Sequence, residues 1–285
     1  NIDEYILKKL KMPHKKSVIK PWVTFTNKLK KCNRKVNIGM IGKYVDLADS
    51  YKSLNESLLH ASVHNNNSLE IDFIDSEDIT KKSIKRLNNL QGIVVPGGFG
   101  NRGVEGKILA ANFARVNHIP YFGICLGMQI SVIEFARNIL GLKNANSTEF
   151  DSKTPYPVIS LVTEWDDYNK GRLKGSTHQM GGTMRLGAQS CTLMKKTLAH
   201  SLYKKSIISE RHRHRYEVNN KFVEKFNDTD LIFSGYSGNK DLMEMLEIKH
   251  HPWYLASQFH PEFTSSPLKG HPLFNSFIKT AYETK

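Results

Sequence analysis

The sequence predicts an α/β protein whose doubly wound, mostly parallel sheet is flanked by helices and carries an antiparallel β excursion. Two patterns lead to this prediction. Between residues 36 and 140, short apolar runs alternate with longer runs of helical periodicity. After Gly141, short apolar runs follow one another, separated by Gly, Asn and Asp. Alternating strands and helices are typical of parallel sheets with right-handed crossovers, whereas consecutive short strands are typical of antiparallel pairing.

The first half of this pattern contains strand–helix pairs. Each expected strand is a short, mostly apolar run, and each expected helix has apolar residues at helical spacing, as in Leu54, Leu58 and Ala61. The expected strands are residues 36–41, 69–74, 93–95 and 121–124, and the expected helices are residues 50–63, 79–90, 104–116 and 127–140.

The second half is expected to be mainly antiparallel. The expected strands are residues 158–163, 183–186, 191–194, 211–218 and 231–236, followed by a hairpin of residues 243–248 and 253–259. Residues 271–282 are expected to close the chain as an amphipathic helix.

Residues 1–35 differ from the rest, because they are basic and irregular apart from a short expected helix at residues 3–10. The chain also begins without methionine. We therefore expect residues 1–35 to be a linker from a preceding domain, and residues 36–285 to form one domain.

Composition narrows the class of protein. The 285 residues are 39% hydrophobic, with no apolar run of eighteen and no signal-peptide pattern at the start. Cys32, Cys125 and Cys191 have no metal-ligand spacing, which favours a reducing, cytoplasmic setting. The net charge of +14 is compatible with nucleic acid, but the lysines are scattered along the chain. We expect a basic surface with no nucleic-acid or membrane partner, and an anionic ligand remains compatible with it.

Residues 123–127 have the form G-x-C-x-G between an apolar strand and a helical run. This is the nucleophile-elbow pattern with Cys125 in place of serine. A helix N-terminus favours negative charge there, and hence a thiolate. The pentapeptide alone is equally compatible with a buried structural cysteine.

His260-Pro-Glu262 follows another apolar strand. In extended chain, residues i and i+2 point to the same side, so Glu262 is expected to orient the imidazole of His260. The alternative for these three residues alone is a surface histidine–glutamate pair.

Pro96-Gly-Gly-Phe-Gly100 ends the strand at residues 93–95 with accessible backbone amides. An oxyanion hole could use one of these amides and that of Leu126. An ordinary turn is the alternative, whereas neither dinucleotide nor Walker phosphate patterns match.

The sequence resembles the class I, or triad, glutamine amidotransferase family in three segments. These are Pro96-Gly-Gly-Phe-Gly100, Gly-Ile-Cys-Leu-Gly-Met-Gln129 and Gln-Phe-His-Pro-Glu262. Further segments resemble the glutaminase domains of the CTP synthases within that family. These segments are residues 144–149, 181–187, 210–220 and 271–274, so the resemblance covers residues 36–285.

The resemblance implies roles for individual residues. Cys125 would attack the glutamine side-chain amide, His260 would move the protons, and Glu262 would hold His260. The oxyanion and glutamine contacts implied by the resemblance are Gly98, Phe99, Leu126, Gly127, Met128, Gln129, Glu149 and Arg215. Glu149 would meet the α-ammonium group and Arg215 the α-carboxylate, which suits a free amino acid.

The resemblance also implies partners. Ammonia would pass to an N-terminal amidoligase domain that binds UTP, ATP and Mg²⁺ and aminates UTP to CTP, in a homotetrameric full enzyme. GTP would be an effector at the loop that carries Arg102 and Glu105. No cofactor or metal is expected in this chain, since His212 and His214 alone are weak evidence for a metal site.

Two other functions remain open. One is a different thiol hydrolase, such as a peptidase or γ-glutamyl hydrolase. The other is a basic regulatory or nucleic-acid-binding module in which the triad is inert.

Overall fold

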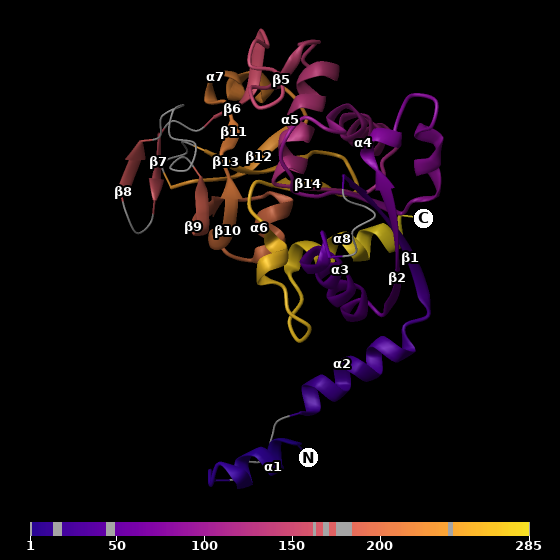
Figure 1. Cartoon of the computed structure of the whole chain (residues 1–285). Coiled ribbons are helices and arrows are strands. Elements are labelled where there is room, and N and C mark those ends of the chain that lie inside the picture. The colour runs from indigo at the N-terminus through magenta and orange to yellow at the C-terminus, as the bar shows by residue number, and fades with distance from the viewer. Residues whose placement is uncertain are drawn as a thin grey trace.

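The structure is a computed structural model that describes residues 2–13, 19–43, 49–161, 164–167, 171–174, 184–238 and 242–284. Its centre is a nine-stranded sheet with the strand order β10-β9-β12-β13-β14-β4-β3-β1-β2. The predicted α/β class, with a large sheet flanked by helices, is confirmed (Figure 1).

Half of the sheet is parallel. It pairs β2 with β1, β1 with β3, β3 with β4, and β4 with β14. These strands are β1 (Arg34–Gly42), β2 (Asn67–Asp75), β3 (Gly92–Val95), β4 (Tyr121–Ile124) and β14 (Tyr254–Ser257). Their carboxyl ends therefore meet at one edge of the sheet.

The other half is antiparallel and begins where β13 pairs with β14. It continues through β12 to β9 and β10. These strands are β13 (Met243–Ile248), β12 (Leu231–Tyr236), β9 (Arg185–Leu193) and β10 (Ile207–His214). The predicted excursion thus extends the parallel sheet from β14, and the predicted hairpin of β13 and β14 is confirmed.

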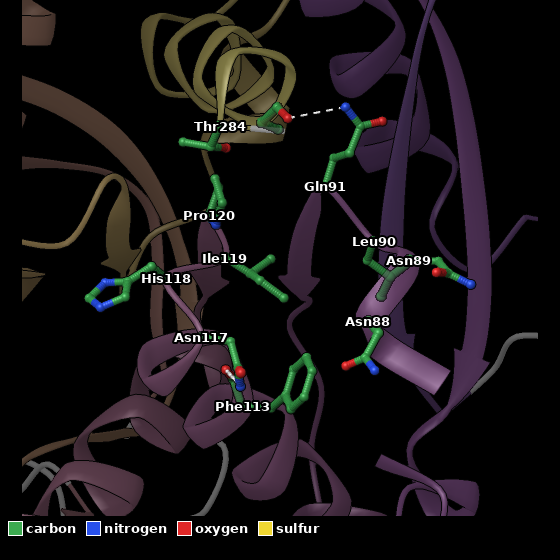
Figure 2. Close-up of a pocket in the computed structure, with 11 residues that line it drawn as sticks. Asn88, Asn89, Leu90, Gln91, Phe113, Asn117, His118, Ile119, Pro120 and Thr284 are labelled. Atoms are coloured by element: carbon green, nitrogen blue, oxygen red, sulfur yellow. Dashed lines mark hydrogen bonds between the residues drawn. The ribbon is translucent and has the colours of Figure 1, made fainter. Parts of the chain in front are cut away.

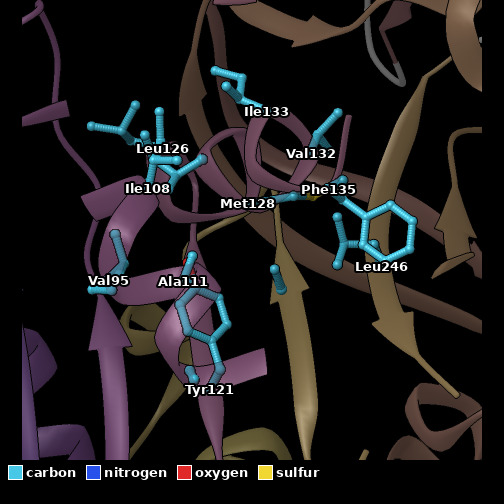
Figure 3. Packing of buried hydrophobic residues seen from close by; sticks show 14 of the residues in the cluster. Val95, Ile108, Ala111, Tyr121, Leu126, Met128, Val132, Ile133, Phe135 and Leu246 are labelled. Carbon is cyan, nitrogen blue, oxygen red and sulfur yellow. The ribbon is translucent and has the colours of Figure 1, made fainter. Parts of the chain in front are cut away.

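Helices cover both faces of the sheet. On one face, α4 (Val104–Val116) and α5 (Leu126–Asn138) pack on β3, β4 and β14, where Tyr121, Met128 and Leu246 share one core (Figure 3). On the other, α3 (Lys52–His64), α6 (Leu198–Tyr203) and α8 (Pro272–Glu283) enclose a second core with Phe122. Successive side chains of β3 point alternately into the two cores. The same holds on β4, where Tyr121 lies in the first core and Phe122 in the second, as strand geometry requires.

Two smaller sheets lie beside this one. One joins β5 (Ala145–Ser147), β6 (Tyr156–Leu161) and β11 (Tyr216–Val218), and the other is the hairpin of β7 (Glu164–Asp167) and β8 (Gly171–Lys174). A short helix, α7 (Asn220–Val223), and the 3₁₀ turn η3 (Glu224–Phe226) follow β11.

The helix predicted at residues 79–90 is wrong. The chain forms two 3₁₀ segments instead, η1 (Ser76–Asp78) and η2 (Ile84–Asn89). Between them, the hydroxyl of Ser83 donates to the carbonyl of Asp78 at 2.6 Å and accepts from the amide of Thr80 at 2.9 Å. These side-chain hydrogen bonds replace those of an α-helix.

Two strand predictions need correction. The separate strands expected at residues 183–186 and 191–194 are one strand, β9, which passes through Gly187 at φ +87°; residue 183 lies outside the described residues. The single strand expected at residues 211–218 is divided at Arg215 into β10 and β11, which belong to different sheets.

The N-terminal segment is also more ordered than expected. Besides α1 (Ile2–Lys9), it forms a second helix, α2 (Lys20–Lys31), with Pro21 in its first turn. Neither helix buries a residue, and both lie outside the layers of the sheet and its helices (Figure 1). The ring of Phe25 reaches the rings of His60 and His64 on α3, at centroid distances of 6.2 and 6.0 Å. No helix in the described part of the chain has the length and apolarity to cross a membrane.

Candidate active site

Cys125 lies at the junction of β4 and α5, as the elbow pattern predicts. It is the residue before α5 and has φ +54° and ψ −101°, a backbone conformation that L-residues rarely adopt. Its amide donates to the carbonyl of Ser257 on β14 at 2.7 Å. Such a sharp turn presents the Sγ atom at the carboxyl edge of the parallel strands, next to the first turn of a helix.

The elbow requires its glycines because its backbone passes very close to other backbone segments of the protein. A Cβ on Gly127 would lie 2.1 Å from the carbonyl oxygen of Val95, and one on Gly123 would lie 2.6 Å from that of Gly127. Both contacts involve backbone, so neither can be relieved by a side-chain rotation. The G-x-C-x-G spacing is therefore a packing requirement of this turn.

His260 and Glu262 lie immediately after β14, the neighbour of β4. The imidazole Nδ1–H donates to Oε1 of Glu262 at 2.7 Å. Glu262 belongs to the 3₁₀ turn η4 (Pro261–Thr264), so the expected i, i+2 pairing in extended chain is wrong in its geometry, although the two side chains do meet. The Nε2 atom has no hydrogen-bond partner among the described residues.

The environment of His260 favours a charged imidazole. Burial opposes the charge, but Cys125 and Glu262 outweigh that effect and raise the pKa of His260 to about 10. A histidine held by a carboxylate through one nitrogen, with a thiol in the same pocket, is suited to stabilising a thiolate and to moving protons.

Cys125, His260 and Glu262 line a common pocket of about 260 Å³. The loop Pro96–Phe99 forms one wall, and a Cβ on Gly97 would come within 2.8 Å of Cε1 of His260. The remaining wall comes from the start of α3, from β10 and from η4. Lining residues that the sequence did not single out are Asp49, Ser50, Tyr51, Lys52, Ser53, Leu54, Arg213 and Phe263.

The predicted oxyanion segments come together beside this pocket. Gly98 lines it, and a Cβ at Gly98 would lie 3.4 Å from Cδ2 of Leu126, so the two segments are in contact. The ring of Phe99 is 49% exposed. The glycine loop and the elbow are thus adjacent, although Leu126 itself does not line the pocket.

Glu149 and Arg215 are neighbours although 66 positions separate them in sequence. Oε1 of Glu149 accepts a hydrogen bond from the amide of Gly100 at 2.6 Å. Burial raises the pKa of Glu149, while Gly100, Lys43 and Arg215 act in the opposite direction. Neither residue lines the pocket that contains Cys125. Opposite charges near each other nevertheless suit the two ends of an amino acid, because its α-ammonium and α-carboxylate share one carbon atom.

Two predicted glutamine contacts are turned inward. The side chain of Met128 is buried in the core (Figure 3). Gln129 is also buried, and its Nε2 donates to the carbonyl of Tyr216 at 3.0 Å. Neither residue lines the pocket that contains Cys125.

Arg102 and Glu105 have partners within the chain. Arg102 lies 3.4 Å from Glu77 and 3.8 Å from Asp75, and it donates to the carbonyl of Lys43. Both oxygens of Glu105 accept from Nη1 of Arg137 at 2.9 Å. The loop between β3 and α4 is thereby tied to the end of β2 and to η1, and the first turn of α4 is tied to α5.

A buried charged cluster supports β10 behind the pocket. Arg185 donates from Nη1 to Glu217 at 2.6 Å, and its Nη2 lies 2.8 Å from Glu244. His212 and His214 lie 2.8 Å apart between these carboxylates, and burial, followed by Arg185, holds their pKa values well below the usual range. The two histidines are therefore neutral structural groups, and no set of three His, Cys, Asp or Glu residues in the described ranges is arranged to hold a metal.

A second cavity of about 300 Å³ lies at the opposite, amino-terminal ends of β3 and β4 (Figure 2). Asparagines and apolar side chains line it, and His118 is its one titratable residue. This lining offers no nucleophile, so the pocket at Cys125 is the stronger candidate for an active site.

Comparisons with known proteins identify the family of this chain. Residues 46–280 match the family model described as glutamine amidotransferase class-I. The chain is similar to a solved structure of the Trypanosoma brucei CTPS glutaminase domain with bound acivicin, with 37% identity over 87% of this chain and 94% of that one and a TM-score of 0.78. A Methylobacillus flagellatus glutamine amido transferase matches at 8% identity over 88% of this chain and 93% of that one, with a TM-score of 0.49.

The fold and the elbow thus define a class I α/β amidotransferase domain. The chain belongs to the class I glutamine amidotransferase family, and its fold is like that of a CTP synthase glutaminase domain.

Proposed function

We propose that this chain hydrolyses L-glutamine through a Cys125–His260–Glu262 triad and supplies the ammonia for ATP-dependent amination of UTP to CTP. The observation that carries the proposal is the arrangement of His260. Its Nδ1 is held by Glu262 at 2.7 Å, its Nε2 has no hydrogen-bond partner in the described part of the chain, and Cys125 acts on the same imidazole to raise its pKa.

In the proposed reaction, the Cys125 thiolate attacks the side-chain carbonyl carbon of glutamine. The oxyanion is stabilised by the amides of Gly98 and Leu126, a contribution of ~3–4 kcal/mol for each donor in comparable sites. The C–N bond then breaks as His260 gives a proton to the leaving nitrogen, which leaves ammonia and a γ-glutamyl thioester. His260 next takes a proton from water, and the resulting hydroxide attacks the thioester to release glutamate and regenerate the thiolate.

Glu149 and Arg215 support glutamine as the substrate, with Glu149 meeting the α-ammonium group and Arg215 the α-carboxylate. A peptidase or γ-glutamyl hydrolase has less use for both charges. We expect Glu149→Gln to raise KM for glutamine more than it lowers kcat. Equal losses on glutamine and on a γ-glutamyl peptide that has a blocked α-amine would instead favour the other hydrolases.

The similarity to the trypanosomal CTPS domain supports UTP amination as the use of the ammonia. In this proposal, a separate amidoligase domain binds UTP, ATP and Mg²⁺, residues 1–35 connect to it, and the full enzyme is a cytoplasmic homotetramer. GTP acts as effector through the loop of Arg102 and Glu105, where Arg102 supplies positive charge. This chain holds no cofactor of its own in the proposed scheme.

Labelling with acivicin, the compound named for the trypanosomal domain, tests the nucleophile. Peptide mass mapping should find one modification, at Cys125, in both the unchanged chain and a Cys32→Ser control. Modification at another residue, or none, would overturn the mechanism. Salt-sensitive binding of DNA or RNA together with an unreactive thiol would favour the inert basic module instead.

A further inference from the structure

A second buried glutamine, Gln258, contacts the proposed nucleophile. Its side chain is fully buried two residues before His260, and its Nε2 donates to Sγ of Cys125 at 3.8 Å. The backbone amide of Gln258 donates to the carbonyl of Glu244 on β13 at 2.8 Å. The residue is therefore anchored to the antiparallel half of the sheet while its side chain reaches the elbow.

The direction of the Gln258 amide follows from its neighbours. A backbone carbonyl only accepts hydrogen bonds, so the carbonyl of Tyr216 requires the NH₂ group of Gln129 to face it, at 3.0 Å. The same Nε2 of Gln129 lies 3.3 Å from Oε1 of Gln258. Turning Gln258 over would set two NH₂ groups against each other, and turning both glutamines would set an oxygen against the Tyr216 carbonyl. The NH₂ group of Gln258 is thus the end that faces the sulfur.

An N–H donor at this place favours the ionised sulfur. Hydrogen bonds to a charged acceptor are stronger than those to a neutral one, and this donor is shielded from water. We propose that Gln258 is a further catalytic residue that donates a hydrogen bond to the Cys125 thiolate, and that Gln129 and the Tyr216 carbonyl are the positioning groups that orient it. This inference rests on the proposed role of Cys125 as the nucleophile.

The sulfur would then be held from two directions. His260, backed by Glu262, adjoins it from the strand end beyond Gln258. The other ionisable groups that line the same pocket are Asp49 and Tyr51 just before α3, Lys52 at its start and Arg213 from β10. Substitution at Gln258 leaves all six of these groups in place, so a change in thiol behaviour would report on the amide.

The test measures the rate of alkylation of Cys125 by iodoacetamide as a function of pH. All variants carry Cys32→Ser, and peptide mass mapping follows Cys125 alone. Gln258→Met removes the donor at similar size, and we expect the pH of half-maximal rate to rise by about one unit. Gln258→Glu keeps the acceptor for Gln129 but sets a carboxylate beside the sulfur, so it should give a larger rise. Gln129→Met should give a smaller rise in the same direction.

Gln91 supplies a matched control. It is also buried and makes two hydrogen bonds, accepting from the Asn37 amide at 3.0 Å and donating to the Ala281 carbonyl at 3.4 Å. It lies at the opposite cavity (Figure 2), so Gln91→Met should leave the alkylation profile unchanged.

A Gln258→Met profile that coincides with that of Gln91→Met would overturn the proposal. So would a Gln258→Glu profile at or below that of the parent, and this variant serves if Gln258→Met does not fold. A parent chain whose Cys125 reacts at no pH would instead refute the proposed function.

Discussion

At the scale of single residues, the site depends on which atoms are left without partners. His260 uses Nδ1 for Glu262, and its Nε2 has no hydrogen-bond partner in the described residues. The side-chain amide of Gln129 donates a hydrogen bond to that of Gln258, which in turn donates to the sulfur of Cys125. The second oxygen of Glu262, Oε2, is buried without a hydrogen-bond partner in the described residues.

The first prediction at this scale concerns the protonation of His260. The pKa of about 10 in the folded chain lies above the ordinary 6.5. The stabilisation from this group is therefore complete below pH 6.5, declines as the pH rises, and is lost above about pH 10. NMR of labelled imidazole should show His260 protonated at pH 8 and titrating at lower pH in Cys125→Ala. Titration near 6.5 in the unchanged chain would contradict the ion pair.

The second prediction concerns Glu262. Glu262→Gln preserves size but removes the charge that orients and stabilises the imidazolium. We expect kcat for glutamine to fall by roughly 10²–10⁴-fold with a small change in KM. Steady-state release of ammonia measures this, with Glu283→Gln on the exposed end of α8 as the matched control. Equal activity of the two variants would show that Glu262 has no role in the reaction.

At the scale of elements, the site is built across a change in strand direction. The nucleophile follows β4 in the parallel half, and the base follows β14, which is parallel to β4 and antiparallel to β13. Behind β10, the Arg185 cluster joins β9, β11 and β13 through Glu217 and Glu244. This cluster fixes the strand that places Arg213 in the pocket and ends beside Arg215.

The third prediction tests that cluster. Arg185→Met would leave two buried carboxylates without their counter-charge, and should lower the free energy of unfolding by about 3–5 kcal/mol. Urea denaturation measures the loss, and the exposed Arg86→Met should change stability by less than about 0.5 kcal/mol. Adding Glu217→Gln and Glu244→Gln should recover much of the loss. Failure of this rescue would mean that Arg185 acts mainly through packing.

At the scale of the whole molecule, the proposed function assigns hydrolysis and amination to separate domains. The described residues offer the pocket at Cys125 for hydrolysis, and we assign amination to another domain. The basic residues are scattered along the sequence, and of those in the described residues Lys52 and Arg213 line the pocket around the thiol.

The fourth prediction follows from that division. The isolated chain should hydrolyse glutamine slowly and should form no CTP from UTP, ATP and Mg²⁺, as measured by nucleotide chromatography. Addition of an amidoligase domain of the CTP synthase type should restore CTP formation from glutamine, but not with Cys125→Ala. CTP formation by the chain alone would refute the proposed division.

The sequence predicted the features that depend on neighbouring residues. The elbow at Cys125, the pairing of His260 with Glu262 and the glycine loop are each contained in a few positions, and the alternation of strands and helices follows from local periodicity. The family that those motifs indicated is confirmed by the match over residues 46–280.

Features that depend on distant contacts were not predicted. Gln258 meets Gln129 from 129 positions away, and no local pattern marks such a pair. The helix predicted at residues 79–90 failed because Ser83 competes for backbone groups. We did not predict helix α2 because its lysines suggested a tether, although Pro21 in the first turn is a helix-start signal.

The hydrogen bond from the Cys125 amide to the Ser257 carbonyl affects the lifetime of the site as well as its geometry. This bond is a rung between β4 and β14, and His260 lies three residues beyond Ser257. The strands cannot separate without parting the thiol from its base. The lifetime of the proposed triad is therefore that of a central β-ladder, and slow amide hydrogen exchange at Cys125 would record how rarely that ladder opens.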